Sequence, residues 1–276
     1  MNAGAHVSVA GGVDKAIDRQ TEIGGSCGQI FAGSPRTWSV AEYTEAEAEA
    51  FRSAREESGQ GPYLVHSTYL VNLATPKDEL WEKSKTCLQK ELDAADSLGV
   101  EYVVFHPGAH TGSGRENGIN RVAEAVDDLQ VPGDVTLLYE NTAGKGTTLG
   151  KEFSELAGML DATSESSVAA CVDTCHAHAA GYDLRDDDGF TETVEEIDST
   201  VGLDNVPVVH VNDSKDPLGS EKDNHEHLGR GEIGDEGFRN LVESELAERP
   251  LVLETPTSDG RSYAENLEHL ESLAVS

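Results

Sequence analysis

Six residues of metal-binding types stand at the ends of six consecutive apolar segments. They are His66, His106, Glu140, Asp173, His210 and Glu254. If those segments are neighbouring parallel strands, their carboxyl ends meet at one edge of the fold and the side chains converge. Any one of them alone would more often be an ordinary hydrogen-bonded side chain than a ligand. Three imidazoles and three carboxylates in one concave site, however, would be destabilising without a cation, so the set predicts a divalent metal cluster.

Two local pairs extend this cluster. His176 follows Asp173 by three residues, and His225 follows Asp223 by two. Spacing alone leaves two choices open, since His178 and His227 lie equally near. Imidazole and carboxylate ligands suit zinc, and also manganese or iron. At about three to four ligands per zinc, nine ligands serve two or three ions if one carboxylate bridges. Such multi-metal sites favour hydrolysis of phosphate esters.

The elements that must position these residues alternate regularly between strand and helix patterns. Short runs rich in Val and Leu predict strands at 3–9, 28–31, 63–66, 102–106, 135–140, 168–173, 206–211 and 251–254. Helical periodicity predicts helices at 13–23, 45–57, 80–98, 119–129, 152–160, 191–201, 238–246 and 264–273. Eight strand–helix units predict an α/β fold, a closed (β/α)₈ TIM barrel, in a single domain spanning 1–276.

Sequence patterns and composition exclude several classes of protein. The glycines after the first strand do not complete the dinucleotide-binding fingerprint, so no nucleotide cofactor is expected. No signal peptide or membrane-spanning run is recognisable, and we expect a cytoplasmic monomer without a membrane partner. Four cysteines without an export signal predict free, buried thiols. The 52 acidic residues against 20 basic ones, a net charge of −32, favour a halophilic source, because concentrated salt screens their repulsion.

Several motifs, in order along nearly the whole chain, resemble those of the endonuclease IV family, the tri-zinc TIM-barrel apurinic/apyrimidinic (AP) endonucleases. The motifs are Gly4-Ala-His-Val-Ser, Phe105-His-Pro-Gly, Glu140-Asn-Thr-Ala-Gly, Val172-Asp-Thr-Cys-His-Ala, His210-Val-Asn-Asp-Ser-Lys, Asp223-Asn-His-Glu-His-Leu-Gly-Arg-Gly-Glu-Ile-Gly and Leu253-Glu-Thr-Pro. A halophilic archaeon is the source that this family and the acidic composition together suggest.

The resemblance implies three zinc ions, with Mn²⁺ an option at some sites. One would be held by His66, His106 and Glu140. The second would be held by Glu140, Asp173, His210 and Glu254, with Glu140 bridging. The third would be held by His176, Asp223 and His225, which would make His178 and His227 mere neighbours.

The implied reaction is hydrolysis of duplex DNA on the 5′ side of an abasic site, leaving a 3′-hydroxyl, as in base excision repair. Removal of 3′-blocking groups is a further activity of the family. Glu140 and Glu254 are the implied catalytic residues, which would orient the attacking water. Arg36, Tyr69 and Leu70 are the implied DNA-binding residues, on loops that enter the duplex and turn the damaged nucleotide out. Lys215 and Arg230 are candidates for contacts with phosphates.

The charge of the chain contrasts with what this function requires. DNA binding normally requires a basic surface, and this chain is strongly acidic. We therefore expect a less acidic crescent around the barrel mouth.

The alternative function is a divalent-metal sugar isomerase or epimerase of the xylose-isomerase-like barrels, which also carry His, Glu and Asp at strand ends. The ligand set of His176, Asp223 and His225 would then be surplus.

Overall fold

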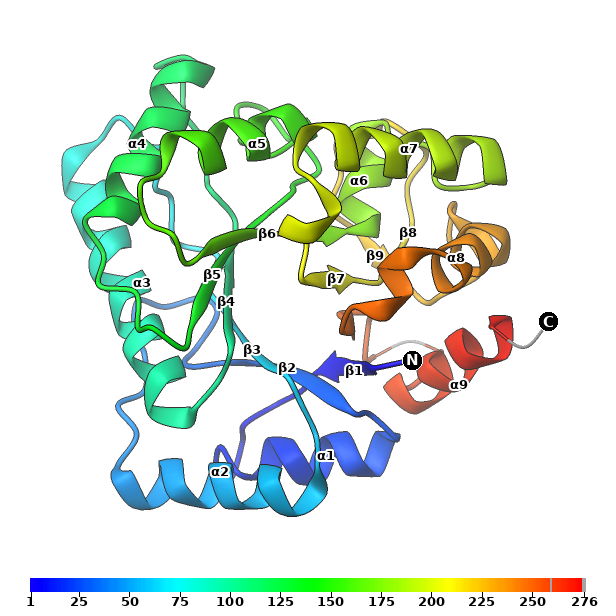
Figure 1. Ribbon diagram of the computed structural model, residues 1–276, viewed down its shortest axis with the longest axis horizontal. Helices are drawn as coiled ribbons and strands as arrows, with labels where there is room; N and C mark the ends of the chain where they lie inside the picture. Colours follow the sequence, from blue (N-terminus) through cyan, green and yellow to red (C-terminus); the bar gives the residue numbers. More distant parts are fainter. Residues whose placement is uncertain (259, 275–276) are drawn as a thin grey trace.

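The computed structural model describes residues 1–258 and 260–274. Eight parallel strands form a closed barrel in which neighbours in sequence are neighbours in space (Figure 1). They are β1 (Ala3–His6), β2 (Cys27–Phe31), β3 (Tyr63–His66), β4 (Tyr102–Phe105), β5 (Thr136–Glu140), β6 (Val168–Asp173), β7 (Val208–His210) and β10 (Leu251–Leu253). The predicted TIM barrel is confirmed, and every predicted strand is present with ends within three residues of the expected ones.

Helices surround the barrel on its outside (Figure 1). The α-helices of the described residues are α1 (Lys15–Ile23), α2 (Glu45–Ser58), α3 (Asp78–Leu98), α4 (Arg115–Asp127), α5 (Phe153–Ala162), α6 (Thr174–Ala180), α7 (Asp187–Thr200), α8 (Gly234–Glu243) and α9 (Tyr263–Leu273). Short 3₁₀ turns cover Leu203–Asn205 and Glu245–Glu248. The eight predicted helices are all found, each with ends within four residues of the expected ones.

Local sequence explains where many of these helices begin and end. Thr44 and Glu47 form a reciprocal capping box at the start of α2, and Ser262 and Glu265 form another at the start of α9. Helix α3 ends at Gly99, whose φ of 65° is in the left-handed region.

Two features were not predicted from the sequence. Helix α6 follows β6 directly, with no loop between them, and its seven residues are too few for a clear periodicity. The long loop after β7 contains an antiparallel pair of two-residue strands, β8 (Asp213–Ser214) and β9 (His225–Glu226). Both features lie in the part of the chain that carries His176, Asp223 and His225.

The apolar core has two parts. A small cluster fills the barrel interior, and it consists of Cys27, Leu64, Val104, Leu138, Ala169, Cys171, Val208 and Val252. A larger cluster lies between the strands and the helices. All four cysteines are buried free thiols, as predicted. Among the described residues, no helix has the length and apolar composition needed to cross a membrane.

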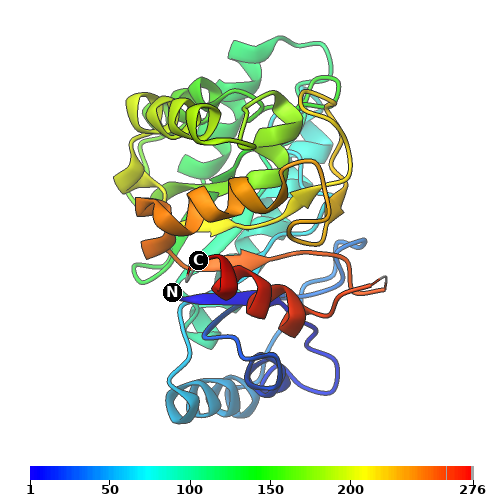
Figure 2. The ribbon, with the colours of Figure 1, turned by 90° about the vertical axis from the view of Figure 1, so that its right-hand side faces the viewer.

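The barrel has two distinct ends. Seen from the side, the long loop 211–233 and other strand-to-helix loops gather at the end away from the two termini (Figure 2). Because all eight strands are parallel, this is the end where their carboxyl ends meet, and functional sites of TIM barrels lie there.

Candidate metal centre

The candidate site is a polar layer lying directly above the apolar interior of the barrel. Side chains two residues apart on a strand point to the same face. The inward residues Leu64, Leu138 and Val208 are therefore each followed, two positions on, by His66, Glu140 and His210. All eight strands obey this rule. The full layer is His6, Gln29, His66, His106, Glu140, Asp173, His210 and Glu254.

The structure brings His66, His106 and Glu140 together. The Nε2 atoms of His66 and His106 lie 3.2 Å and 3.0 Å from the same carboxylate oxygen, Oε2 of Glu140. The donor atoms of all three residues lie within 4.8 Å of one another, which is compatible with one shared ion.

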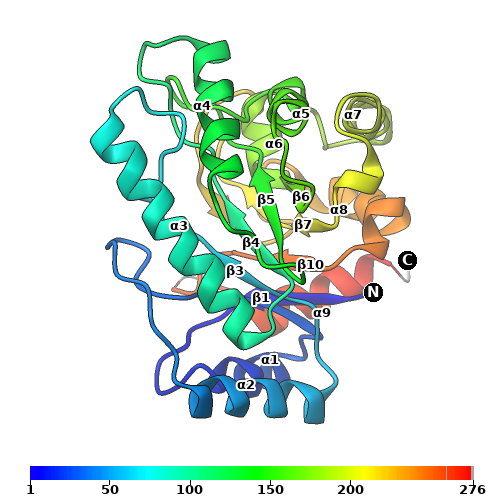
Figure 3. The ribbon, with the colours of Figure 1, turned by 60° about the vertical axis from the view of Figure 1, so that its left-hand side comes forward.

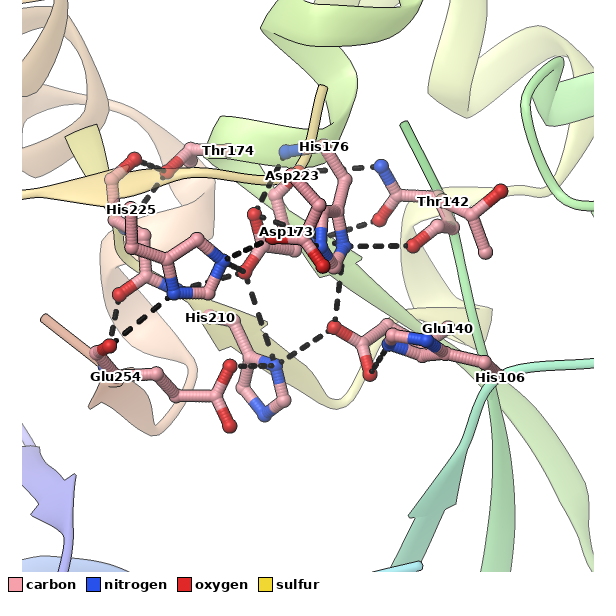
Figure 4. A network of polar contacts seen from close by, with 12 residues as sticks. His106, Glu140, Thr142, Asp173, Thr174, His176, His210, Asp223, His225 and Glu254 are labelled. Atoms are coloured by element: carbon pink, nitrogen blue, oxygen red, sulfur yellow. Dashed lines mark hydrogen bonds and ion pairs between the residues drawn. The ribbon is translucent and has the colours of Figure 1, made fainter. Parts of the chain in front are cut away.

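A second group uses the other oxygen of Glu140. Nδ1 of His210 lies 3.0 Å from Glu140 Oε1, 3.5 Å from Glu254 Oε2 and 4.0 Å from Asp173 Oδ2 (Figure 4). These four residues again have donor atoms within 4.8 Å of one another. Glu140 thus takes part in both groups, one oxygen in each, as a bridging carboxylate must.

The third group joins α6 to the hairpin β8–β9. Oδ1 of Asp223 lies 3.2 Å from His176 Nε2 and 3.1 Å from His225 Nε2 (Figure 4). Asp173 accepts a hydrogen bond from the backbone N–H of His176 at 2.8 Å, and so caps α6 while also facing the second group. This cap fixes the first turn of α6, so that His176 points into the site.

The two histidines left open by spacing lie elsewhere. His178 is buried one half-turn further along α6 and belongs to none of the metal-type groups found among the described residues. His227 lies on the far side of the loop, where its Nδ1 is 3.0 Å from Asn266 Nδ2.

The pKa shifts of the side chains in this layer indicate a site that requires positive charge. Burial alone would raise the pKa of the Glu140 carboxyl, but the facing charges of His106 and His210 hold it well below its ordinary value. Burial alone would lower the pKa of His176, but the carboxylates Asp173 and Asp223 raise it well above 6.5. Each of these buried groups is therefore stabilised in its charged form by the groups of opposite charge that face it.

The donor set fits divalent metal ions. Among the described residues, the buried Nε2 atoms of His106 and His225 lack a hydrogen-bond partner, although each lies close to a carboxylate oxygen. Both ring nitrogens face a common space without the alignment that a hydrogen bond requires. Buried polar atoms without a hydrogen-bond partner are rare in folded proteins. A bound zinc ion would explain them, because zinc binds nitrogen and oxygen donors arranged around one point.

Amide side chains that were not predicted from the sequence hold the candidate ligands in place. Gln29 donates from Nε2 to Glu254 at 2.6 Å, and its Oε1 lies 2.8 Å from His210 Nε2. Asn212 donates to Asp173 Oδ2 at 2.7 Å and accepts from the backbone of Glu254 at 2.8 Å. Asn141 Oδ1 accepts the backbone N–H of Asp173 at 2.6 Å. Such outer hydrogen bonds orient metal ligands.

His6 was also missed, although a signal was available. The predicted first strand ran to residue 9, whereas β1 ends at His6. The rule of a polar residue at each strand end would therefore have found it. His6 Nδ1 lies 3.3 Å from Glu254 Oε1, and its ring packs on Phe31 at 4.2 Å between centroids.

One further residue stands close to the ligands. Donor atoms of Cys175, Asp173 and His225 lie within 4.8 Å of one another. Burial raises the pKa of the Cys175 thiol to about 12.

The site opens to solvent through two adjoining hollows. One, of about 340 Å³, lies over the ligands and is also lined by Lys215 and Asn224. The other, of about 770 Å³, lies beside it over β1 and β2. Tyr69 borders both, and its side chain is strongly exposed at 63%. Leu70 is half-buried next to it, and Arg36 is exposed on the loop after β2.

Charge is distributed unevenly around the barrel mouth. The loops 32–44, 67–77, 106–114 and 141–151 carry Arg36, Lys77, Lys145 and Lys151 against a single acid, Glu42, a net charge of +3. We call these four loops the basic crescent. The loop 211–233 carries three basic and six acidic residues. Lys151 is paired with Glu221 of that loop at 2.6 Å, and the basic crescent is thus less acidic than the chain as a whole, whose net charge is −32.

Comparison with known proteins agrees with this geometry. The family described as xylose isomerase-like TIM barrel matches residues 17–273. A Natronomonas pharaonis protein named probable endonuclease 4 is 49% identical over 274 residues, covering 99% of this chain and 98% of its own. Its counterpart in Haloarcula marismortui is 47% identical and is covered to 99%. This chain belongs to the endonuclease IV family.

The structural comparison separates this family from the rest of the superfamily. The crystal structure of endonuclease IV from Thermus thermophilus matches with a TM-score of 0.89 and 41% identity, covering 99% of this chain and 98% of that one. A D-tagatose 3-epimerase-like protein matches with a TM-score of 0.75 but only 18% identity, which shows a shared fold alone. The predicted resemblance to endonuclease IV is confirmed, and the relatives from halophilic archaea fit the acidic composition.

Proposed function

We propose that this member of the endonuclease IV family is a zinc-dependent AP endonuclease that cuts duplex DNA on the 5′ side of abasic sites. The observation that carries the proposal is the nine-residue cluster in which Glu140 gives one oxygen to each of two groups. Full-length relatives named probable endonuclease 4 support the same conclusion.

The three groups would hold three zinc ions, with Mn²⁺ an option at some of them. His66, His106 and Glu140 would hold the first, while Glu140, Asp173, His210 and Glu254 would hold the second. His176, Asp223 and His225 would hold the third. When bound, such ions lower the pKa of water toward neutrality and offset negative charge on a phosphodiester.

The carboxylates of the chain have a defined task in this reaction. Hydrolysis adds water to phosphorus, breaks the bond between phosphorus and the 3′-oxygen, and leaves a 3′-hydroxyl and a 5′-phosphate. Glu254 lines the hollow over the layer and would orient the attacking water and accept its proton, while the buried Glu140 would help to orient that water. Gln29 fixes Oε1 of Glu254 through its 2.6 Å hydrogen bond, which leaves Oε2 facing the cluster.

The surface above the cluster suits DNA better than a small sugar. The basic crescent offers positive charge to the phosphates. Tyr69 projects between the two hollows, where it can enter a duplex and support an extrahelical abasic sugar. Arg36 and Leu70 would take part in the same intrusion, while Lys215 and Arg230 would meet phosphates across the mouth. Removal of 3′-blocking groups would use the same ligands.

We also propose that the protein acts as a monomer in the cytoplasm, where its DNA substrate lies. The sugar isomerase or epimerase alternative is less supported, because the similarity to an epimerase-like protein at 18% identity extends to the fold alone. The group of His176, Asp223 and His225 would have no use in a site with one or two ions.

The test is incubation of zinc-loaded protein with a duplex that contains one synthetic abasic site, at salt concentrations from low to several molar. We expect a single nick 5′ of the abasic site, ending in a 3′-hydroxyl that a polymerase extends. Metal analysis should give three zinc ions per chain. Absence of nicking by zinc-loaded protein at every salt concentration would overturn the proposal.

A further inference from the structure

A buried carboxylate outside the metal centre supports the loops at its rim. Glu91 lies on α3, the long helix that packs across β3 and β4 (Figure 3), and only 3% of its surface is exposed. Its neighbours on the buried face of α3 are apolar, among them Leu88 and Leu92. A carboxylate buried among apolar side chains destabilises the folded protein unless hydrogen-bond donors face it.

Among the described residues Glu91 has two hydrogen-bond partners, and both belong to the loop that follows β3. Ser67 donates its hydroxyl to Oε2 at 2.5 Å, and Thr68 donates its backbone N–H to Oε1 at 2.9 Å. Each carboxylate oxygen thus fixes one of the two residues immediately before Tyr69. The two oxygens of the side chain thus accept one hydrogen bond each.

The same loop is bonded to the neighbouring loop after β2. The carbonyl of Pro35 accepts the hydroxyl of Thr68 at 2.7 Å and the backbone N–H of Tyr69 at 3.2 Å. Arg36 follows Pro35 directly. A continuous series of hydrogen bonds therefore runs from Glu91 through Thr68 to Pro35, and it ends next to the two exposed side chains of these loops.

Those exposed side chains have little else to position them. Tyr69 makes ring contacts with Phe31 and His66 at 5.9 Å and 6.0 Å between centroids, but most of its surface is free. Arg36 is exposed. The orientation of both depends on the backbone below them, and that backbone depends on Glu91.

We propose that Glu91 is a positioning residue that holds the Tyr69 loop, and through Pro35 the Arg36 loop, in the arrangement that engages DNA. This inference rests on the proposed function, since it assigns the loops to the duplex. It assigns different tasks to two parts of the protein: the metal centre cleaves the phosphodiester, while the Glu91 series holds the loops that recognise a double helix.

The separation can be measured with two substrates. One is the duplex with a single abasic site, and the other is bis(p-nitrophenyl) phosphate, a small diester that needs the metal centre but no intruding loop. In Glu91→Ala, we expect KM for the duplex to rise about tenfold or more, the effect of leaving buried donors without a partner. Hydrolysis of the small diester and zinc content should stay within about twofold of wild type, since Glu91 is no ligand.

Three variants complete the experiment. In Glu91→Gln, the amide oxygen still accepts from Thr68 and the amide nitrogen can donate to the Ser67 hydroxyl, so KM should remain within about threefold of wild type. Thr68→Val keeps the shape but removes the bond to Pro35, and it should reproduce the rise in KM. Glu79→Ala, at an exposed position on the first turn of α3, is the control and should change nothing.

Each possible result either supports or overturns the role proposed for Glu91. Equal losses on both substrates, or loss of zinc in Glu91→Ala, would show a general structural role and overturn the inference. An unchanged KM for the duplex in Glu91→Ala would also overturn it. If Glu91→Ala does not fold, Thr68→Val decides, since a normal KM in that variant refutes the series. Failure of the wild-type protein to nick the duplex would instead refute the proposed function.

Discussion

Replacing Glu91 by glutamine should make the stability of this protein less sensitive to pH. Burial raises the pKa of Glu91 from 4.5 to about 7, against the opposing effects of its hydrogen bonds to Ser67 and Thr68 and of the His66 charge. The folded protein therefore binds this proton more tightly than the unfolded chain. Stability contributed by the protonated form is complete below pH 4.5 and is lost as the pH rises to about 7 and beyond.

The size of the effect follows from the difference of about 2.5 between the two pKa values, at 1.36 kcal/mol per pKa unit. It amounts to about 3 kcal/mol in total, of which about 2.5 kcal/mol falls between pH 5 and pH 8. Glutamine has the same shape and cannot ionise. The free energy of unfolding of Glu91→Gln, relative to wild type, should therefore rise by about 2.5 kcal/mol over this range.

The assay is urea unfolding of both proteins at pH 5, 6, 7 and 8, at one fixed high salt concentration and with zinc present. Protonation of the metal ligands changes the stability of both proteins alike, so it cancels in the difference. A difference that stays constant within about 0.5 kcal/mol across the range would refute the reasoning, because it would mean that the carboxyl of Glu91 is not desolvated in the folded state.

Three further predictions concern the metal centre and the DNA surface. Glu254→Gln should lower kcat on the abasic duplex by about 100-fold or more, with an unchanged circular dichroism spectrum, since it removes a carboxylate that would hold the second ion and accept the proton of the attacking water; near-normal cleavage would refute its role. Removal of metal by a chelator should abolish cleavage and lower the melting temperature, because Glu140 and Asp173 lose a facing cation. Readdition of zinc should restore both properties, and full activity of a metal-free sample would contradict the assignment. Arg36→Ala should reduce the slope of log binding constant against log salt by about 0.9 if Arg36 meets one phosphate. Lys90→Ala, on an exposed part of α3, should leave the slope unchanged, and an unaltered slope in Arg36→Ala would exclude the contact.

The acidity of the chain and its DNA substrate are compatible because the charges are segregated. The basic crescent carries a net charge of +3, and the acids lie largely on the outer helices, such as the five glutamates at 45, 47, 49, 56 and 57 of α2. In about 1 M salt the Debye length is only about 3 Å, so these distant acids scarcely weaken attraction at the mouth. Local charge then decides binding, rather than the net charge of the protein.

Much of the site could be predicted from the sequence because the geometry of a parallel strand determines where its side chains lie. Each strand ends at one edge and its side chains alternate, so a residue such as His66 or Glu140 at a strand end must face the axis of a closed barrel. The same rules would have identified His6, had the end of β1 been placed correctly.

Other parts depended on contacts between segments that are distant in the sequence. Gln29 and Asn212 became recognisable as supports of the ligands only when their amides were seen against Glu254, His210 and Asp173. The positions of such amide side chains follow no recognisable sequence pattern, so their role could not be predicted from the sequence.

The sequence by itself determined the eight-unit barrel and the types of donor at its mouth, because both follow from periodicities within single segments. Tertiary structure alone decided which donors share a point in space. His176 rather than His178 faces the cluster because Asp173 caps α6 and fixes the rotation of its first turn. Glu140 stands between two groups because His106, just after β4, faces one of its oxygens and His210, on β7 beyond β6, faces the other. A metal centre depends on distances across the barrel, which only the closure of the sheet defines.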